Sequence, residues 1–201
     1  FTLLATKLGV EKMVLLSGRG EKEAQVCEEI VKATAQKWTI VRASWFNQNF
    51  SESFFLEPVL AGFVALAKSQ VLEPFIDADD IAEVVTEALL NEKHNGQTYE
   101  LTGPQLLTFK QAVAEIAKTT ERNIIFQAIE LEEYIAMLRE YQVPEDEIWL
   151  INYLFSEVLD GRNSSITNDV EKVLGRKATT FSEYVKKTAK SGIWNQINQL
   201  S

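Results

Sequence analysis

Two short apolar runs near the start of the chain each lead into side chains that could bind a small molecule. The run 13–20 ends in Ser17-Gly18-Arg19-Gly20, and the run 38–44 ends at Ser44 and is followed by Trp45-Phe46-Asn47-Gln48-Asn49. Hydroxyl and amide groups offer hydrogen-bond donors and acceptors without a fixed charge, and aromatic rings can form a wall against a flat organic molecule. These two segments are therefore the first candidates for a binding site.

Three nearby carboxylates, Asp77, Asp79 and Asp80, have the chemistry of metal ligands. They stand directly before a segment with helical apolar spacing, where carboxylates commonly cap the helix and interact favourably with its dipole. No histidine or cysteine lies close enough in the sequence to complete a ligand set. We therefore expect helix capping at this position, and no metal site.

The residue types needed for nucleophilic catalysis are scarce. His94 is the only histidine and lies in the polar stretch 91–96, where we expect a solvated loop residue. Cys27 is the only cysteine, which permits no internal disulfide and suits a reducing, cytoplasmic location. Its place on the inner face of a helix favours a small buried hydrophobic residue over a reactive thiol. No Ser-His-Asp or Cys-His arrangement is indicated.

The composition is that of a globular domain and argues against two classes of partner. The chain has 201 residues, 46% hydrophobic and 24% charged, which is enough for one core or a core with a small lobe. The net charge of −9 opposes binding to nucleic acid and to anionic membranes. No apolar stretch approaches the roughly 20 residues of a membrane span. A small-molecule partner fits this composition better.

The elements that must position the candidate residues form a βαβ unit. The two apolar runs read as strands, and the helix between them places Ala24, Cys27, Ile30 or Val31, and Thr34 on one face. Strands of this kind are typical of a parallel sheet with helices on both faces, and ligands bind such sheets at the carboxyl ends of the strands. Both candidate segments lie at those ends.

The remaining elements alternate at first and then become mostly helical. Short strands are expected at 63–66, 72–76, 97–101 and 124–129. A helix follows Asp79 or Asp80, with Glu83 as the capping-box partner of Asp80. Thr108 with Gln111, and Thr180 with Glu183, start two further helices. Other helical segments are expected from Thr167 to Gly175, through 131–138, and at 148–159.

The beginning of the chain lacks the usual features of a nucleotide-binding domain. It contains no G-x-G-x-x-G and no Walker-type loop, whose backbone N–H groups would meet a pyrophosphate at a helix N-terminus. Residues 1–9 instead keep helical spacing and end in Gly9, a typical C-terminal cap. We expect the chain to start inside a helix, with an upstream segment absent from this sequence.

Four motifs occur in register along the chain, namely Leu15 to Gly20, Thr39 to Phe50, Asp77 to Ala82, and Tyr99 to Pro104. Together they resemble the NmrA-like group of atypical short-chain dehydrogenase/reductases, including its ergot-alkaloid-reductase-like branch. The resemblance covers nearly the whole chain and implies the α/β fold of a Rossmann-type parallel sheet, of which this chain carries the C-terminal half, with a small, mostly helical C-terminal lobe. It implies NAD(P)H as cofactor, and a glycine-rich loop upstream of Phe1. Residues 1–50 would then complete the NAD(P)-binding domain, and 51–201 would form the substrate-side lobe with segments returning to the sheet.

The resemblance also implies roles for the candidate residues. Cofactor contacts would come from residues at the ends of the two strands. Alternative roles remain open: a turn-forming role for Ser17-Gly18, a surface ion pair for Arg19, and core packing for Trp45 and Phe46. Substrate contacts would come from two amides beside the aromatic wall and from an apolar helix further on. The expected cofactor-binding residues are Ser17, Gly18, Arg19, Ser44, Trp45 and Phe46, and the expected substrate-binding residues are Gln48, Asn49, Trp149 and Tyr153.

One departure from the family pattern leaves the catalytic residue unassigned. Most short-chain dehydrogenases use a Tyr-x-x-x-Lys pair, and by the usual family spacing those positions fall near Gly20 and Ala24, which can do no acid–base chemistry. Tyr153 could supply the missing hydroxyl. Two hypotheses follow: an NAD(P)H-dependent reductase of a quinone-, enal- or imine-like substrate, or a non-catalytic NAD(P)(H) sensor that acts through a protein partner.

Overall fold

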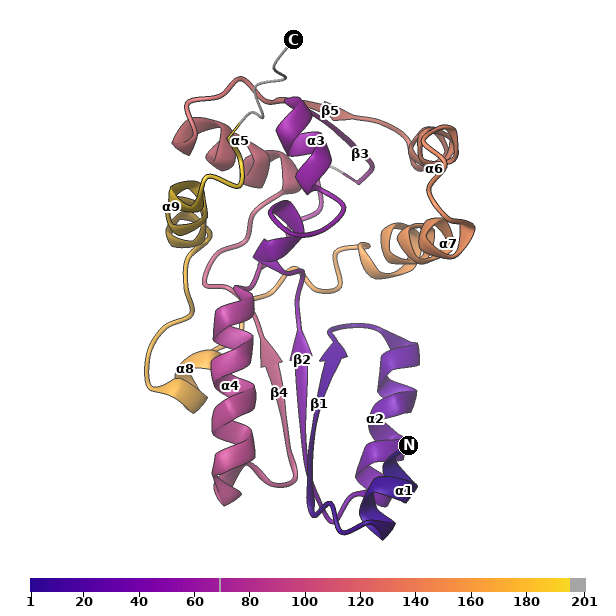
Figure 1. Ribbon diagram of the computed structural model, residues 1–201, viewed down its shortest axis with the longest axis vertical. Helices are drawn as coiled ribbons and strands as arrows, with labels where there is room; N and C mark the ends of the chain where they lie inside the picture. Colours follow the sequence, from indigo (N-terminus) through magenta and orange to yellow (C-terminus); the bar gives the residue numbers. More distant parts are fainter. Residues whose placement is uncertain (69, 196–201) are drawn as a thin grey trace.

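A parallel three-stranded sheet forms one end of the molecule in the computed structural model, which describes residues 1–68 and 70–195 (Figure 1). Its strands are β1 (Lys12–Gly18), β2 (Lys37–Ala43) and β4 (Gln97–Leu101), in the order β1-β2-β4. Strand β2 is central, and Ile40 and Val41 are completely buried in it. The sequence-based prediction of a parallel α/β sheet is confirmed.

Helices α2 (Lys22–Thr34) and α4 (Ala78–Leu90) cover opposite faces of this sheet (Figure 1). Alternate residues of a strand point to opposite faces, and accordingly Ser17 contacts α2 whereas Val41 packs with the apolar stripe of α4. The expectation that Cys27 faces inward is wrong, because it is exposed. The buried residues of α2 are Glu28 and Val31. The face of α2 that is buried is therefore shifted by about one residue from the face that the sequence predicted.

Two short helices, α1 and α8, pack against the helices that cover the three-stranded sheet. Helix α1 (Thr2–Lys7) packs on α2 and has no buried residue, and Gly9 follows it in the left-handed region at φ 89°. Helix α8 (Asp169–Leu174) packs on α4 and β4 and ends at Gly175, also left-handed. Both helices were predicted from their spacing and their terminal glycines.

The upper lobe in Figure 1 is built around a second, two-stranded parallel sheet of β3 (Phe63–Leu66) and β5 (Ile125–Ala128). Its core is rich in aromatic side chains, among them the fully buried Phe50, Phe55, Phe109 and Phe155. The helices of the lobe are α3 (Leu56–Ala61), α5 (Phe109–Thr119), α6 (Leu131–Glu140), α7 (Glu145–Tyr153) and α9 (Phe181–Ser191).

The predicted strand at 72–76 is wrong. Only isolated bridges form there, from Glu73 to Leu107 and from Ile76 to Phe46. Pro74 lies between them and has no N–H to donate to a ladder, so the pairing cannot continue. The predicted helix at 148–159 is also divided: α7 ends at Tyr153, and a π-helical turn, η3 (Leu154–Val158), follows it.

The capping predictions are confirmed at two helices and wrong at one. Thr108 with Gln111, and Thr180 with Glu183, form complete capping boxes on α5 and α9. On α4 the cap is Asp77, whose carboxylate accepts from the Asp79 N–H at 3.0 Å. Asp80 is buried and instead accepts from the backbone N–H of Thr179 at 2.7 Å.

His94 is buried, contrary to the expectation of a solvated residue. It lies in the short 3-10 turn η2 (Glu92–His94), its Nδ1 is 2.8 Å from the Tyr99 hydroxyl, and its carbonyl accepts from Thr39 Oγ1 at 2.8 Å. The polar residues next to His94 in the sequence suggested a solvated position. The partners that bury it, Thr39 and Tyr99, lie on β2 and β4 and are distant or non-adjacent in the sequence.

Candidate functional site

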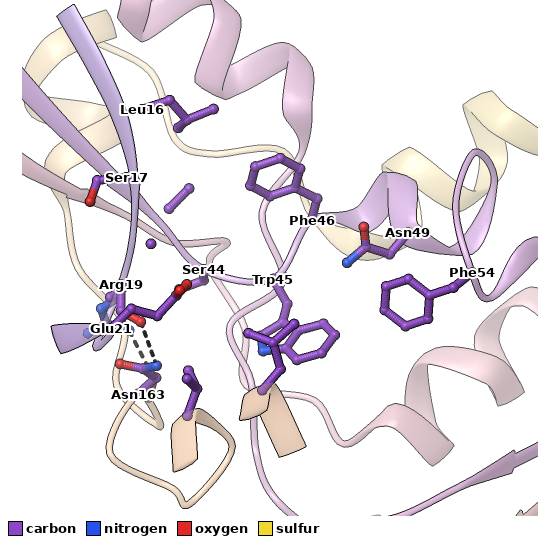
Figure 2. A pocket seen from close by; sticks show the side chains of 14 residues that line it. Leu16, Ser17, Arg19, Glu21, Ser44, Trp45, Phe46, Asn49, Phe54 and Asn163 are labelled. Carbon is purple, nitrogen blue, oxygen red and sulfur yellow. Dashed lines mark hydrogen bonds between the residues drawn. The ribbon is translucent and has the colours of Figure 1, made fainter. Parts of the chain in front are cut away.

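A pocket opens at the carboxyl ends of β1 and β2, between the sheet and the upper lobe (Figure 2). Its volume is about 340 Å³, which lies at the lower end of the range usual for small-molecule sites. The lining comes from both strand ends and from segments distant in the sequence: Leu16, Ser17, Gly18, Arg19, Glu21, Ala43, Ser44, Trp45, Phe46, Asn49, Phe54, Leu154, Val158 and Asn163.

The pocket brings together the six expected cofactor-binding residues and one of the expected substrate-binding residues, Asn49. Gln48 turns away from it: its Nε2 donates to Asp77 Oδ1 at 2.7 Å, and its Oε1 accepts from the Ala78 N–H at 2.9 Å. Gln48 therefore reinforces the start of α4.

Trp149 and Tyr153 lie outside the lining of this pocket. Trp149 is 67% exposed and stacks on Tyr153 with ring centroids 5.9 Å apart. The Tyr153 hydroxyl donates to the Glu23 carboxylate, and this hydrogen bond is the main cause that raises the pKa of Tyr153 to about 12. The side chains of this helix that do reach the pocket are Leu154 and Val158, from the π-helical turn.

One wall of the pocket is aromatic and is anchored in the core of the lobe. The Trp45 ring meets Phe109 and Phe155 edge to face, with centroids 5.2 Å and 5.6 Å away, and meets Phe54 at 6.2 Å. Because Phe109 and Phe155 are fully buried, Trp45 has little freedom to move. Trp45 thus lines the pocket and also packs against the core, so the two roles that the sequence suggested for it are compatible.

The hydroxyl of Ser44 is a buried polar group of the pocket that has no hydrogen-bond partner among the described residues. Ser44 is 5% exposed, and its Oγ makes no hydrogen bond to any of the described residues. Its backbone N–H donates to the Leu101 carbonyl at 3.1 Å, which continues the β2–β4 ladder. A buried hydroxyl without a partner costs free energy, and a ligand in the pocket could remove that cost.

Arg19 is committed to contacts within the chain. Its Nε lies 3.1 Å from Glu100, and its Nη1 donates at 2.9 Å to the backbone carbonyls of both Asn163 and Ser165. The Asn163 amide donates back to the Arg19 carbonyl at 3.0 Å, as the dashed lines of Figure 2 show. Arg19 is buried, so its ion pair with Glu100 is not the exposed surface pair that the sequence offered as an alternative.

A charged network lies beneath the strand ends. The Ser17 hydroxyl and the Arg42 Nε both donate to Glu28 Oε1 at 2.8 Å, and Arg42 Nη1 reaches Glu100 at 3.2 Å. Burial opposes ionisation of Glu28, but the hydrogen bonds from Arg42 and Ser17 outweigh it, and the pKa of Glu28 is lowered. The network joins α2 to all three strands of the sheet.

A second buried carboxylate, Glu73, has no such support. Glu73 is completely buried, and neither of its carboxylate oxygens has a hydrogen-bond partner among the described residues. Burial, only partly opposed by the positive charge of Arg19, raises the pKa of Glu73 to about 7. Glu73 is therefore largely protonated below neutral pH.

Glu21 is a charged residue of the pocket that sequence reasoning missed. It occupies the N-cap position of α2 with an extended backbone, and its side chain makes no capping hydrogen bond. Its carboxylate lies over Gly18 instead: a Cβ added to Gly18 would stand only 1.8 Å from Glu21 Oε1. Two features of the sequence hint at this position, namely a carboxylate directly after the glycine-containing turn and a glycine three residues earlier.

Three parallel strands, helices on both faces and a pocket at the carboxyl ends of the strands define the Rossmann-type class of fold. Solved structures agree. An NADPH-dependent quinone oxidoreductase from Escherichia coli has a TM-score of 0.79 at 20% identity, over 92% of this chain and 70% of that one. The Citrobacter sp. triphenylmethane reductase complexed with NADP(H) has a TM-score of 0.79 at 19% identity, over 93% and 68%.

Sequence relatives place the chain within that class. It is 30% identical to the NAD(P)H azoreductase of Xenophilus azovorans over 83% of this chain, and 27% identical to the agroclavine dehydrogenase of Claviceps fusiformis over 92%. It is also 27% identical to prestalk A differentiation protein A of Dictyostelium discoideum over 80% of this chain. No family model matches. The similarity to these reductases is consistent with the family resemblance that the sequence motifs indicate.

The alignments cover only part of the relatives. The chain spans 54% of the length of prestalk A differentiation protein A, 56% of the azoreductase and 67% of the agroclavine dehydrogenase. In the part of the chain that the structure describes, no helix has the length and apolar character needed to cross a bilayer.

Proposed function

We propose that this chain forms the substrate-side part of an NAD(P)H-dependent oxidoreductase that reduces a small, flat organic molecule. The observation that carries the proposal is the pocket at the carboxyl ends of β1 and β2, with an aromatic wall on one side and the unpartnered Ser44 hydroxyl on the other. Ligands of open parallel sheets bind at this edge. The printed names of the azoreductase and the agroclavine dehydrogenase support the same class of reaction.

The described residues fit the nicotinamide end of such a cofactor. The pocket volume of about 340 Å³ suits a ring and its substituents, and Ser44 Oγ is a buried polar atom that lacks a partner. Trp45 and Phe46 offer an apolar wall, and Ser17, Gly18 and Arg19 form the opposite rim. When bound, NAD(P)H supplies a hydride. The chain's own groups then hold the acceptor against the wall and exclude water from the reacting atoms.

The substrate class follows from the polarity of the lining. Apart from Arg19, whose charge is paired with Glu100, the charged side chain of the pocket is Glu21. A lining of aromatic and aliphatic groups with few polar atoms suits quinones, enals and imines. We also propose that residues 1–50 complete the nucleotide-binding domain, and that 51–201 form the substrate-side lobe with segments that return to the sheet, among them α4 and β4. The exposed thiol of Cys27 fits a reducing, cytoplasmic location.

A non-catalytic sensor is the second candidate. It is favoured by the lack of acid–base side chains at Gly20 and Ala24, and by the similarity to prestalk A differentiation protein A, whose name refers to no reaction. Such a protein would bind NAD(P)(H) in the same pocket and report it to a protein partner.

Steady-state oxidation of NADH and NADPH by the full-length protein separates the two functions. We expect turnover above background with at least one acceptor from a panel of quinones, enals and imines. Tight nucleotide binding by calorimetry without turnover of any acceptor would favour the sensor. Absence of both binding and turnover would contradict the two functions alike.

A further inference from the structure

We propose that Glu21 is the proton donor of this pocket, the group that protonates the substrate atom on which negative charge develops during hydride transfer. The proposal rests on the reductase function proposed above. Glu21 lies next to the positions where the tyrosine and lysine of most short-chain dehydrogenases would fall. With Glu21 as the acid, the site favours substrates that must take up a proton when they accept the hydride.

The fold brings the Glu21 carboxylate to the strand ends. Gly20 is left-handed at φ 76°, and the chain turns there so that the Glu21 side chain folds back over Gly18. Gly18 pairs in register with Ala43, the residue before Ser44. The Glu21 carboxylate therefore lies over the end of β1, the Ser44 hydroxyl directly follows the end of the adjacent β2, and both groups line the pocket (Figure 2).

The turn that carries Glu21 is held firmly in place. Asn163 fills the space beside Gly20, where a Cβ would stand 2.6 Å from Asn163 Oδ1, and its amide donates to the Arg19 carbonyl. Arg162 Nη1 donates to the Gly20 carbonyl at 3.3 Å. A catalytic side chain needs such support, because a displacement of about 1 Å can cost on the order of 100-fold in rate.

Glu21 differs from its acidic neighbours because no cation or donor among the described residues occupies its carboxylate. Glu23 accepts from Tyr153, Glu28 binds Arg42 at 2.7 Å, and Glu100 binds Arg19 at 3.1 Å. Glu21 also leaves the N–H groups at the start of its own helix uncapped. Its oxygens are thus available to a ligand.

The surroundings of Glu21 favour the protonated acid. Burial raises the pKa of the Glu21 carboxyl, and the negative charge of Glu23 raises it further. The other titratable groups nearby do not oppose this, because Tyr153 is hydrogen-bonded to Glu23 and Arg162 is paired with Asp160 at 2.7 Å. A carboxyl group with a raised pKa keeps its proton to higher pH and can act as a general acid.

The proposed step balances as follows for a neutral acceptor. The hydride and its electron pair form a new bond at the electrophilic carbon or nitrogen of the substrate. The π electron pair of the C=O, C=N or N=N group moves to the heteroatom, which takes the proton from Glu21 as the O–H bond breaks. The Glu21 carboxylate then regains a proton from water. A cationic acceptor needs no proton, because the hydride alone neutralises it.

This difference supplies the test. The full-length protein and its Glu21→Gln variant are assayed with a neutral quinone and with a triarylmethyl cation. We expect Glu21→Gln to lower kcat for the quinone by about 100-fold or more, to remove the fall in kcat at high pH, and to leave reduction of the cation within about twofold. Glu29→Gln, on the exposed face of the same helix, is the matched control and should change neither reaction.

A second variant moves the carboxylate without removing it. Gly18→Ala places a methyl group 1.8 Å from the present position of Glu21 Oε1, so the carboxylate must move, and we expect kcat for the quinone to fall more than kcat for the cation. An equal loss for both acceptors in Glu21→Gln, or an unchanged kcat and pH profile for the quinone, would overturn the role of Glu21 and leave the reductase function standing. A wild-type protein that reduces neither acceptor would overturn the reductase function, and the proposed step with it.

Discussion

Ser17 donates its hydroxyl proton to Glu28, a carboxylate with no exposed surface, over 2.8 Å. The proton of Ser17 is therefore directed away from any ligand, and Ser17 can offer the pocket only the lone pairs of its oxygen. Ser44 Oγ, one strand further on, keeps its proton free. A ligand that presents one donor and one acceptor, such as a carboxamide, would match this pair of hydroxyl groups.

Removal of the Glu28 carboxylate should destabilise the protein. Glu28→Ala leaves the Arg42 guanidinium and the Ser17 hydroxyl without their shared partner, and breaking a buried ion pair typically costs roughly 3–5 kcal/mol. Because Arg42 is 20% exposed, we expect the lower end of that range. Urea unfolding measures the change, with Glu29→Ala as a surface control. A loss below about 1 kcal/mol would contradict this account of the network.

Glu73 should make the stability of the protein fall as the pH rises from 4.5 to about 7. Its pKa is raised from 4.5 to about 7 in the folded state, so the folded state binds this proton more tightly than the unfolded state. The resulting stabilisation is complete below pH 4.5 and is lost as the pH rises to about 7, with a magnitude of about 3 kcal/mol.

The Glu73→Gln variant tests this prediction, because glutamine has the same shape and cannot ionise. We expect it to remove most of the stability change between pH 5 and pH 8, as measured by thermal melting across that interval. If the variant and the parent protein lose stability in parallel over this interval, Glu73 is not the responsible group.

Trp45 should affect both turnover and stability. Trp45→Ala removes the edge-to-face contacts with Phe109 and Phe155, and because Trp45 is partly buried we expect a loss of about 3 kcal/mol in unfolding free energy as well as a large fall in kcat. Trp45→Phe keeps an aromatic wall and should be milder in both respects. Normal kcat in a destabilised Trp45→Ala protein would show that the ring serves only the core.

The Tyr153→Phe variant tests whether Tyr153, rather than Glu21, is the proton donor. Because the Tyr153 hydroxyl is bound to Glu23 and its pKa is raised to about 12, it is a poor proton donor at neutral pH. We expect kcat of the variant to stay within about twofold of the parent value. A tenfold loss with an unchanged melting temperature would support the role inferred for Tyr153 from the sequence.

Patterns that depend on neighbours in the chain could be predicted from the sequence. The βαβ unit follows from apolar spacing, and the capping boxes at Thr108 and Thr180 follow from a partner three residues away. The position of Trp45 beside the pocket follows from the rule that ligands bind at the ends of parallel strands.

Features that depend on distant partners could not be predicted. Glu28 reads as a surface residue until Arg42 is placed opposite it, and His94 reads as a loop residue until Tyr99 and Thr39 surround it. Glu21 reads as an ordinary N-cap, and only the space above Gly18 shows that its side chain points elsewhere.

The position of β1 at the edge of the sheet has a consequence for handling the chain in solution. Within residues 1–68 and 70–195, β2 is the only strand that pairs with β1, so one row of backbone N–H and C=O groups is open to another strand. Leu16 on that strand is 46% exposed, and Val26 on the adjacent helix is 63% exposed. Open strand edges flanked by apolar side chains promote the addition of a strand from another molecule, and thereby aggregation. A preparation of these 201 residues alone should therefore form concentration-dependent oligomers in sedimentation experiments, held in check by mutual repulsion at a net charge of −9 and increasing as salt screens it.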